Sequence, residues 1–441
     1  MRRIVLTLAA TAALLLVTSQ PASAADQRFI VRSTGGLASV LQFCATANCQ
    51  VQGVLDGSIG QTYLVTSSSD LLAERLNPTL TLLETLLGIQ SVEPDILLSI
   101  SNVPLASPAP GLADIAPVNY YGTLVWHGYV SQPAAQIINL ANAQSSFQVS
   151  GIGIVADIDT GVDPTHPALM PVLLPGYDFT RNQPGASEWL DVTGMTSGMT
   201  GAGSENAQPV LVQQSTAAVL DQSTAAVLDG TPYADFGHGT MTAGLIHLAA
   251  PTAKLLPLKA FSANGTGYIS NIIAAIYYAT QNSASVVNMS FDTTVPSPAL
   301  SAAVSNANQS GVVLVASAGN EDTSASVYPA SLSPFVMGIA STSDSDVLSS
   351  FSNYGTADVW IAAPGENIMS TYPGGTYASS SGTSFSCPLV TGTVALLLNA
   401  HSGVNQSNAA AAVAHAQPLT ANLNHGRLDV YQAVLAWFSS Q

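Results

Sequence analysis

The most constraining feature of this sequence is a series of short apolar runs that do not alternate with polar residues. Examples are residues 152–156, 286–289 and 312–316, and Ala-rich helical stretches lie between such runs at 272–280 and 299–308. Strands that are apolar on both faces and alternate with helices are typical of a parallel sheet covered by helices on both sides. We therefore expect an α/β fold, with a three-layer parallel-sheet domain over residues 120–441.

A second, smaller unit is predicted before it. Residues 29–31, 62–65 and 96–100 have the pattern of strands, and a Leu-rich helix with a proline near its start is expected over 71–87. Together they predict a small α+β domain over residues 26–101, of about 75 residues, which is enough for an independent domain.

Two further segments carry no sustained periodicity. Residues 102–119 contain four prolines together with Ser and Ala, a composition typical of an exposed linker. Residues 180–231 are rich in Gly, Ser, Thr, Gln and Met and hold a tandem copy of Gln-Ser-Thr-Ala-Ala-Val-Leu-Asp at 214–221 and 222–229. Because the copy is far shorter than a solenoid repeat, we expect a surface insertion there.

The first residues have the pattern of an export signal. Arg2 and Arg3 precede an apolar run over residues 4–17, and a small-residue cleavage site follows at 22–24. A membrane anchor is the alternative, but it needs about 18 apolar residues and this run has 14. No later segment is expected to span a bilayer. We therefore predict a signal peptide over residues 1–25 and a secreted protein, extracellular or periplasmic, that has no membrane partner after signal removal.

Cysteine usage fits an oxidising compartment only in part. Cys44 and Cys49 lie close together and are expected to form a disulfide, whereas Cys387 stands alone. No His neighbours Cys387 in sequence, so a small buried core residue is a better interpretation than a nucleophile.

Charge excludes one class of partner. The chain has 9 Lys and Arg against 26 Asp and Glu, a net charge of −17. So few cations cannot neutralise a phosphate backbone, and we expect no nucleic acid partner.

Asp159 is the first candidate for chemistry. It follows an apolar run and lies within Asp-Thr-Gly at 159–161. The carboxyl ends of parallel strands are where α/β sheets bind ligands. The same tripeptide occurs in aspartic proteases, but their chemistry needs two carboxylates that share a proton, and no second Asp-Thr-Gly or Asp-Ser-Gly exists in the chain.

Three more candidates follow along the chain. His238 stands between two glycines at a predicted helix start, a context that His166, His247 and His401 lack. Ser384 precedes the apolar helix 389–398, where free amides and the helix dipole stabilise negative charge, although a helix N-cap looks much the same. Asn320 follows another apolar run and is either an oxyanion donor or a turn residue.

In the order Asp159, His238, Asn320, Ser384, these motifs strongly resemble the subtilisin-like serine peptidases, the subtilases. The resemblance implies a catalytic triad of Asp159, His238 and Ser384, with Asn320 in the oxyanion hole. It also implies that residues 26–101 form an inhibitory propeptide of a self-processed zymogen, that protein or peptide is the substrate, and that the chemistry needs no cofactor. The substrate-binding residues it implies are Ser290, Phe291, Asp292, Ser317, Ala318 and Gly319.

Some positions depart from the family pattern. Ala168 replaces a frequent calcium-ligating Asp, so no metal ligand is assigned and a structural calcium ion stays open. Asp292 stands where the family usually has a glycine, at the rim of the expected pocket, and Val327 falls near the pocket floor, where a bulky residue shortens the pocket. A carboxylate at this rim favours small or basic residues before the scissile bond, unless Asp292 points to solvent. A catalytically silent binding or scaffold protein on the same fold is the alternative function, but all four catalytic positions are filled.

Overall fold

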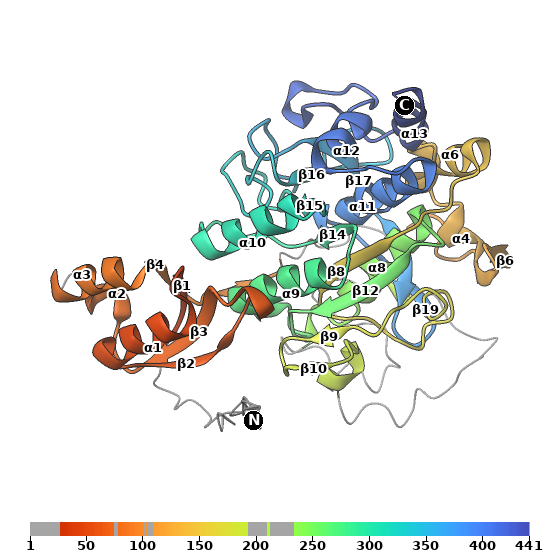
Figure 1. Cartoon of the computed structure of the whole chain (residues 1–441). Coiled ribbons are helices and arrows are strands. Elements are labelled where there is room, and N and C mark those ends of the chain that lie inside the picture. The colour runs from red at the N-terminus through yellow and green to blue at the C-terminus, as the bar shows by residue number, and fades with distance from the viewer. Residues whose placement is uncertain are drawn as a thin grey trace, which may run out of the picture.

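The computed structural model describes residues 27–74, 78–100, 103, 109–192, 210–211 and 233–440. Its centre is an eight-stranded sheet (Figure 1) in which, among these residues, every neighbouring pair is parallel except β10 and β9. In sheet order the strands are β10 (Gln183–Pro184), β9 (Tyr177–Asp178), β12 (Lys254–Lys259), β8 (Ile154–Asp159), β14 (Val286–Met289), β15 (Val313–Ser317), β16 (Met337–Thr342) and β17 (Ile361–Pro364).

Helices cover both faces of this sheet. The core on one face includes α8 (His238–Ala249), α11 (Thr383–Ala400) and α13 (Val430–Ser439), and the core on the other includes α9 (Ile269–Gln281) and α10 (Pro298–Gln309). Strands such as β14 and β15 are buried along their whole length. The predicted three-layer α/β fold is confirmed, because strands apolar on both faces can be buried only between two helical layers.

Helix α11 is the central helix of the domain. It contacts the four strands β14, β15, β16 and β17 and also packs against α8. By length and composition it could cross a membrane, so the expectation that no segment after residue 17 could do so is wrong. Most of it is buried inside the protein, as is usual for the core helix of a globular domain.

A separate four-stranded antiparallel sheet, in the order β2-β3-β1-β4, forms the N-terminal unit, drawn in red and orange beside α9 and α10 (Figure 1). Its core includes residues of three helices and of the sheet. Its elements are β1 (Gln27–Ser33), α1 (Gly36–Ala47), β2 (Cys49–Val54), β3 (Thr62–Ser67), α2 (Leu71–Glu74), α3 (Pro78–Leu87) and β4 (Ile89–Pro94).

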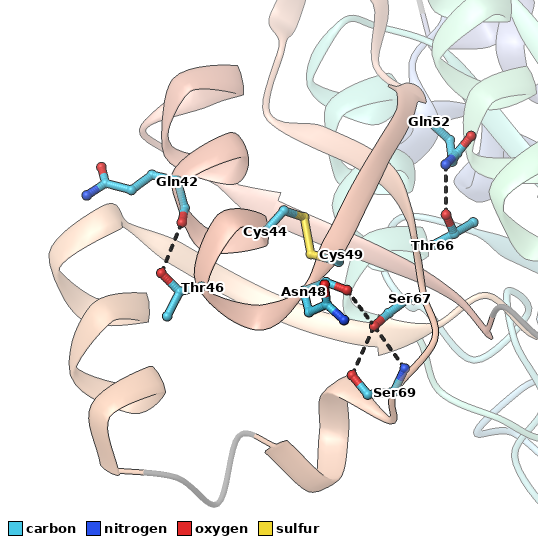
Figure 2. The surroundings of a disulfide bond; sticks show 9 residues. All are labelled: Gln42, Cys44, Thr46, Asn48, Cys49, Gln52, Thr66, Ser67 and Ser69. Carbon is cyan, nitrogen blue, oxygen red and sulfur yellow. Dashed lines mark hydrogen bonds between the residues drawn. A yellow bond between two sulfur atoms is a disulfide. The ribbon is translucent and has the colours of Figure 1, made fainter. Parts of the chain in front are cut away.

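A disulfide joins Cys44 and Cys49, as expected (Figure 2). It links the last turn of α1 to the first residue of β2 across Asn48, which has a left-handed backbone conformation (φ 53°). The Ser67 hydroxyl on β3 donates to the Asn48 carbonyl at 3.2 Å, so the same corner is also tied to the next strand (Figure 2).

The expected helix over 71–87 is wrong as a single element. The chain forms α2 and α3 instead, and Pro78 is the first residue of α3. Proline has no backbone N–H to donate, so it is tolerated at the first position of a helix and not in its interior.

The expected exposed linker also differs from the structure where the structure describes it. Ala109 and Leu112 are each 4% exposed, and the Ala109 amide donates to the Ser379 hydroxyl at 3.0 Å. A hairpin of β6 (Pro117–Tyr120) and β7 (Thr123–Trp126) follows. Proline is compatible with the start of such an edge strand, so its presence did not require an open linker.

The predicted insertion is partly integrated into the domain. Within its described part, β10 pairs with β9, and Glu188 and Val192 are each 1% exposed. The tandem repeat at 214–229 and the predicted signal peptide lie outside the described residues, so they stay predictions.

Candidate active site

Asp159 and His238 form a hydrogen-bonded pair at the carboxyl edge of the sheet. Asp159 is the last residue of β8, and His238 is the first residue of α8. The His238 Nδ1 atom lies 2.7 Å from Asp159 Oδ1 and 2.9 Å from Oδ2. Both side chains are almost fully buried, so their orientation is held by packing as well as by this bond.

Glycines on both sides of His238 make this packing possible. Gly237 has a φ of 92° and lies against the Tyr372 ring. A Cβ atom at Gly239 would lie 2.1 Å from the Gly161 carbonyl and 3.1 Å from Asp159 Oδ1. A larger residue at either position would push the helix start away from Asp159, which explains the flanking pattern in the sequence.

Ser384 lies in the first turn of α11. Gly382 is the N-cap of this helix, so the alternative interpretation of Ser384 as an N-cap is wrong. The Ser384 hydroxyl donates to the Ser290 carbonyl at 3.2 Å, and no hydrogen-bond partner is found for His238 Nε2 in the described part of the chain. The imidazole ring packs against Phe385, the next residue after Ser384, with ring centroids 5.3 Å apart.

Asn320 follows β15 and is held against the start of α11. Its Oδ1 atom accepts from the backbone amide and from the hydroxyl of Thr383, both at 2.9 Å. These two bonds orient the carboxamide so that Nδ2 is its donor beside the free amides of the helix N-terminus. Side-chain and backbone donors that converge in this way can stabilise an oxyanion.

The protonation of His238 is set by two opposing effects. Burial lowers the pKa of the imidazole, but the charge of Asp159 and its hydrogen bond outweigh burial and raise the pKa above its ordinary value. Asp159 therefore favours the imidazolium ion, which is what a general base becomes after it has accepted a proton.

The predicted substrate-binding residues lie at the ends of two neighbouring strands. Ser290, Phe291 and Asp292 follow β14, and Ser317, Ala318 and Gly319 end or follow β15. The side chains of Phe291, Ser317 and Ala318 are buried, so contact with a ligand falls to their backbone groups. The Ser290 hydroxyl donates to the Ser384 carbonyl at 2.9 Å.

Asp292 is partly buried and not fully turned to solvent. Burial and the charge of Glu321 raise the pKa of Asp292 to about 7. Glu321 itself accepts from the Asn320 amide at 2.9 Å. Two carboxylates therefore lie close to the predicted oxyanion donor.

Sequence reasoning missed Glu188. This buried carboxylate accepts from the Thr240 hydroxyl at 2.6 Å and from the Gly239 amide at 3.2 Å, and it also contacts the Thr160 hydroxyl. It ties the first turn of α8 to the residue after Asp159, and burial raises its pKa to about 7. Its position in a segment without periodicity gave no signal of this role.

Asp157 was also missed as a functional candidate, together with Thr242 and Asn288. Asp157 Oδ2 lies 2.8 Å from the Thr242 hydroxyl and Oδ1 accepts from the Asn288 amide at 2.9 Å, directly behind the Asp159–His238 pair. A carboxylate inside an otherwise apolar strand was the available signal.

The remaining sequence candidates have other environments. Cys387 is buried, and burial raises the pKa of its thiol to about 12, so it stays protonated at neutral pH. His166 contacts the Thr376 carbonyl at 2.9 Å, and His401 contacts the Ser402 carbonyl at 2.9 Å. Among the described residues no group of three or more His, Cys, Asp or Glu could hold a metal ion, and Ala168 is fully buried.

The amino-acid sequence matches a known family and several known proteins. The sequence model described as the Subtilase family matches residues 152–431. The chain is 33% identical to Thermitase of Thermoactinomyces vulgaris over 64% of this chain and 88% of that protein. It is also 33% identical to the Thermophilic serine proteinase of Bacillus sp. (strain AK1) over 64% of this chain, and 41% identical to Subtilisin BL of Lederbergia lenta over 36% of this chain. The matches span 61% and 62% of the latter two proteins.

Solved structures share the fold. Fervidolysin from Fervidobacterium pennivorans superposes with a TM-score of 0.68 at 22% identity, over 93% of this chain and 61% of that chain. A lanthipeptide protease superposes with a TM-score of 0.54 at 21% identity, over 69% of this chain and 94% of that chain.

Proposed function

The chain belongs to the subtilase family, and from this and the site geometry we propose that it is a serine endopeptidase that hydrolyses protein or peptide substrates. The observation that carries the proposal is the buried Asp159–His238 pair. His238 Nε2 has no hydrogen-bond partner among the residues that the structure describes, and its ring packs beside the Ser384 turn of α11. A relative named as a serine proteinase supports the same activity.

Ser384 and His238 carry out the chemical steps. Ser384 Oγ attacks the peptide carbonyl, and His238 Nε2 accepts its proton and returns it to the leaving amine. This requires the Ser384 hydroxyl to leave the Ser290 carbonyl, to which it donates at 3.2 Å, and to turn toward His238. Water then hydrolyses the acyl-enzyme with His238 as base. No cofactor takes part in these steps.

Asp159 and Asn320 stabilise the charges that develop. Asp159 holds His238 in the tautomer with the proton on Nδ1 and stabilises the imidazolium ion. Asn320 Nδ2 and the Ser384 amide donate to the oxyanion, and Thr383 holds the Asn320 carboxamide in place.

An organophosphorus serine probe tests the activity against the alternative of a catalytically silent protein on the same fold. We expect the wild-type protein to be labelled at Ser384, and His238→Ala to abolish most of the labelling because the serine loses its base. A folded wild-type protein that resists the probe would contradict the proposal.

The N-terminal unit supports the further proposal that the protein is made as a zymogen. The strand β5 (Leu97–Ser99) pairs antiparallel with β13 (Thr266–Tyr268), and the Ile100 amide donates to the Gly265 carbonyl at 3.0 Å. Leu98 and Ile100 are buried in the same core cluster as Phe291. The end of this unit thus lies in extended conformation beside the strand ends that carry the active site, as a bound peptide would.

Two carboxylates of the N-terminal unit accept hydrogen bonds from the helices of the larger domain. Glu93 accepts from the Ala299 amide and the Ser297 hydroxyl at the start of α10, both at 2.9 Å. Asp95 accepts from the Ser270 amide at the start of α9 at 2.9 Å. Negative charge at helix N-termini is favourable, so these contacts support a propeptide that inhibits until it is removed.

Export completes the proposal. The signal-like pattern over residues 1–25 and the disulfide between Cys44 and Cys49 both fit a protein secreted to the extracellular space or the periplasm.

A further inference from the structure

A second carboxylate lies directly behind the Asp159–His238 pair. Asp157 precedes Asp159 by two residues in β8 and is 3% exposed. The Thr242 hydroxyl lies between the two carboxylates, 2.8 Å from Asp157 Oδ2 and 3.4 Å from Asp159 Oδ2. Thr242 is therefore the link between Asp157 and the carboxylate that orients His238.

The contacts of the Thr242 hydroxyl favour a proton on Asp157. The hydroxyl is close to three oxygens, because the Gly239 carbonyl is also 3.0 Å away. A hydroxyl carries one proton. If Asp157 were ionised, all three oxygens would be acceptors, and two of them would face the lone pairs of Thr242. A proton on Asp157 Oδ2 removes the conflict, because the acid donates to Thr242 and Thr242 donates to one of the other two oxygens.

Hydrogen bonds also connect the second oxygen of Asp157 to the backbone of the residue that carries the nucleophile. Asn288 Nδ2 donates to Asp157 Oδ1 at 2.9 Å and to the Ser290 hydroxyl at 2.9 Å. Ser290 in turn donates to the Ser384 carbonyl at 2.9 Å. The amide orientation of Asn288 is fixed because its Oδ1 atom accepts from Thr391 and Cys387, at 2.9 and 3.1 Å.

No Lys or Arg in the described residues contacts Asp157. The titratable groups that face it are Asp159 on its own strand, His238 on α8 and Cys387 on α11. β14 contributes only the uncharged Asn288, and α9 has no charged residue. On β12, Lys254 and Lys259 bind the Pro171 carbonyl and Asp191 instead.

We propose that Asp157 is a neutral carboxylic acid in the active enzyme and acts as a positioning residue, holding Asp159 through Thr242 and Ser384 through Asn288 and Ser290. This inference rests on the proposed peptidase function. Burial and the charge of Asp159 raise the pKa of Asp157 to about 8. The acid supplies a donor without a second negative charge beside His238. Above this pKa the donor is lost, so activity declines.

The pH dependence of kcat/KM tests this role in the full-length, matured protein. Asp157→Asn keeps a donor for Thr242 and an acceptor for Asn288, whereas Asp157→Val keeps neither at similar volume. We expect Asp157→Val to fall about 10- to 100-fold below Asp157→Asn at neutral pH, because it leaves two buried polar groups unpaired. We also expect the acidic limb of the profile to stay in place in Asp157→Asn, and the decline above about pH 8 to disappear.

Two results would overturn the inference. A shift of the acidic limb to lower pH by about one unit in Asp157→Asn would mean that a negative charge had been removed from beside His238, and hence that Asp157 is ionised. Equal activity of Asp157→Val and the wild type would mean that Asp157 positions nothing.

Thermal unfolding supplies a readout that does not depend on activity. Ser384→Ala proteins with and without Asp157→Asn are compared between pH 4 and 8. An acid that is neutral in the folded protein but ionises near pH 4 in the unfolded protein holds an extra proton in the folded state. The stability of the folded protein therefore falls as the pH rises. We expect the Tm advantage of the Asp157→Asn protein to widen across this range, and a constant or shrinking difference would contradict the inference. If the Ser384→Ala proteins show the expected widening, but the wild-type protein is neither labelled by the serine probe nor active, only the peptidase function is contradicted.

Discussion

At the scale of single residues, Ser384, His238 and Asn320 are expected to contribute very unequally. Ser384→Ala or His238→Ala should each lower turnover about 10⁶-fold, because triad residues act as a unit. Asn320→Ala should cost about 10² to 10³ in rate, because it removes one oxyanion donor and leaves the nucleophile intact. Initial rates on a peptide substrate, with circular dichroism as the control for folding, measure both. Full turnover by a folded Ser384→Ala protein would exclude the mechanism.

Asp292 is expected to set the preference for the residue before the scissile bond. Its pKa of about 7 means that it gains charge as the pH rises through neutrality. We expect this residue to be small or basic and not Phe, Tyr or Trp, and kcat/KM for substrates with Lys or Arg there to rise between about pH 6 and 8.

Peptide-library profiling of the wild type beside Asp292→Gly checks this specificity, and Asp292→Asn is the matched control for charge. Both substitutions should remove the rise with pH. A wild-type preference for large aromatic residues that Asp292→Gly leaves unchanged would show that Asp292 does not shape the pocket.

At the scale of helices and strands, the features that depend on local sequence were predicted better than those that depend on contacts between distant residues. Strands buried on both faces are visible in the sequence because every residue of β14 and β15 must be compatible with a core. The positions of Asp159, His238 and Ser384 at element ends followed from the same patterns. Asp157 could not be assigned a role, because its partners Thr242 and Asn288 lie 85 and 131 residues away.

Boundaries and connections were predicted less well for a related reason. Pro78 marks a helix start that a Leu-rich pattern conceals. The burial of Ala109 depends on Ser379, which is 270 residues away and which no local pattern reveals. Composition predicted an exposed segment there, but tertiary packing decides the outcome.

The disulfide of the N-terminal unit is expected to matter for folding of that unit. Replacement of Cys44 and Cys49 by Ser should lower its stability by about 2 kcal/mol, because the bond closes a short loop and restricts the unfolded chain. Thermal unfolding of the full-length Ser384→Ala protein, with and without the two substitutions, measures the loss. The Ser67 bond to Asn48 remains in both proteins, so an unchanged unfolding transition would mean that this bond suffices at the corner.

At the scale of the whole molecule, the proposed zymogen makes a prediction about its own chain. We expect Ser384 to cleave between about residues 100 and 119, because β5 leads the chain past the active-site edge of the sheet. Mass spectrometry of wild-type and Ser384→Ala proteins expressed in a protease-deficient host locates the new N-terminus. Identical maturation of both proteins would rule out self-processing.

The pairing of β5 with β13 also constrains how such a protein can diverge. Leu98 and Ile100 are buried with Phe261, Ile269 and Phe291 in one cluster. Any substitution that reshapes this cluster for a new substrate also changes the surface that the chain's own N-terminal unit contacts. Lineages that acquire a new preference are therefore expected to carry matched changes in residues 97–100, and laboratory selection for altered cleavage should mutate both segments together.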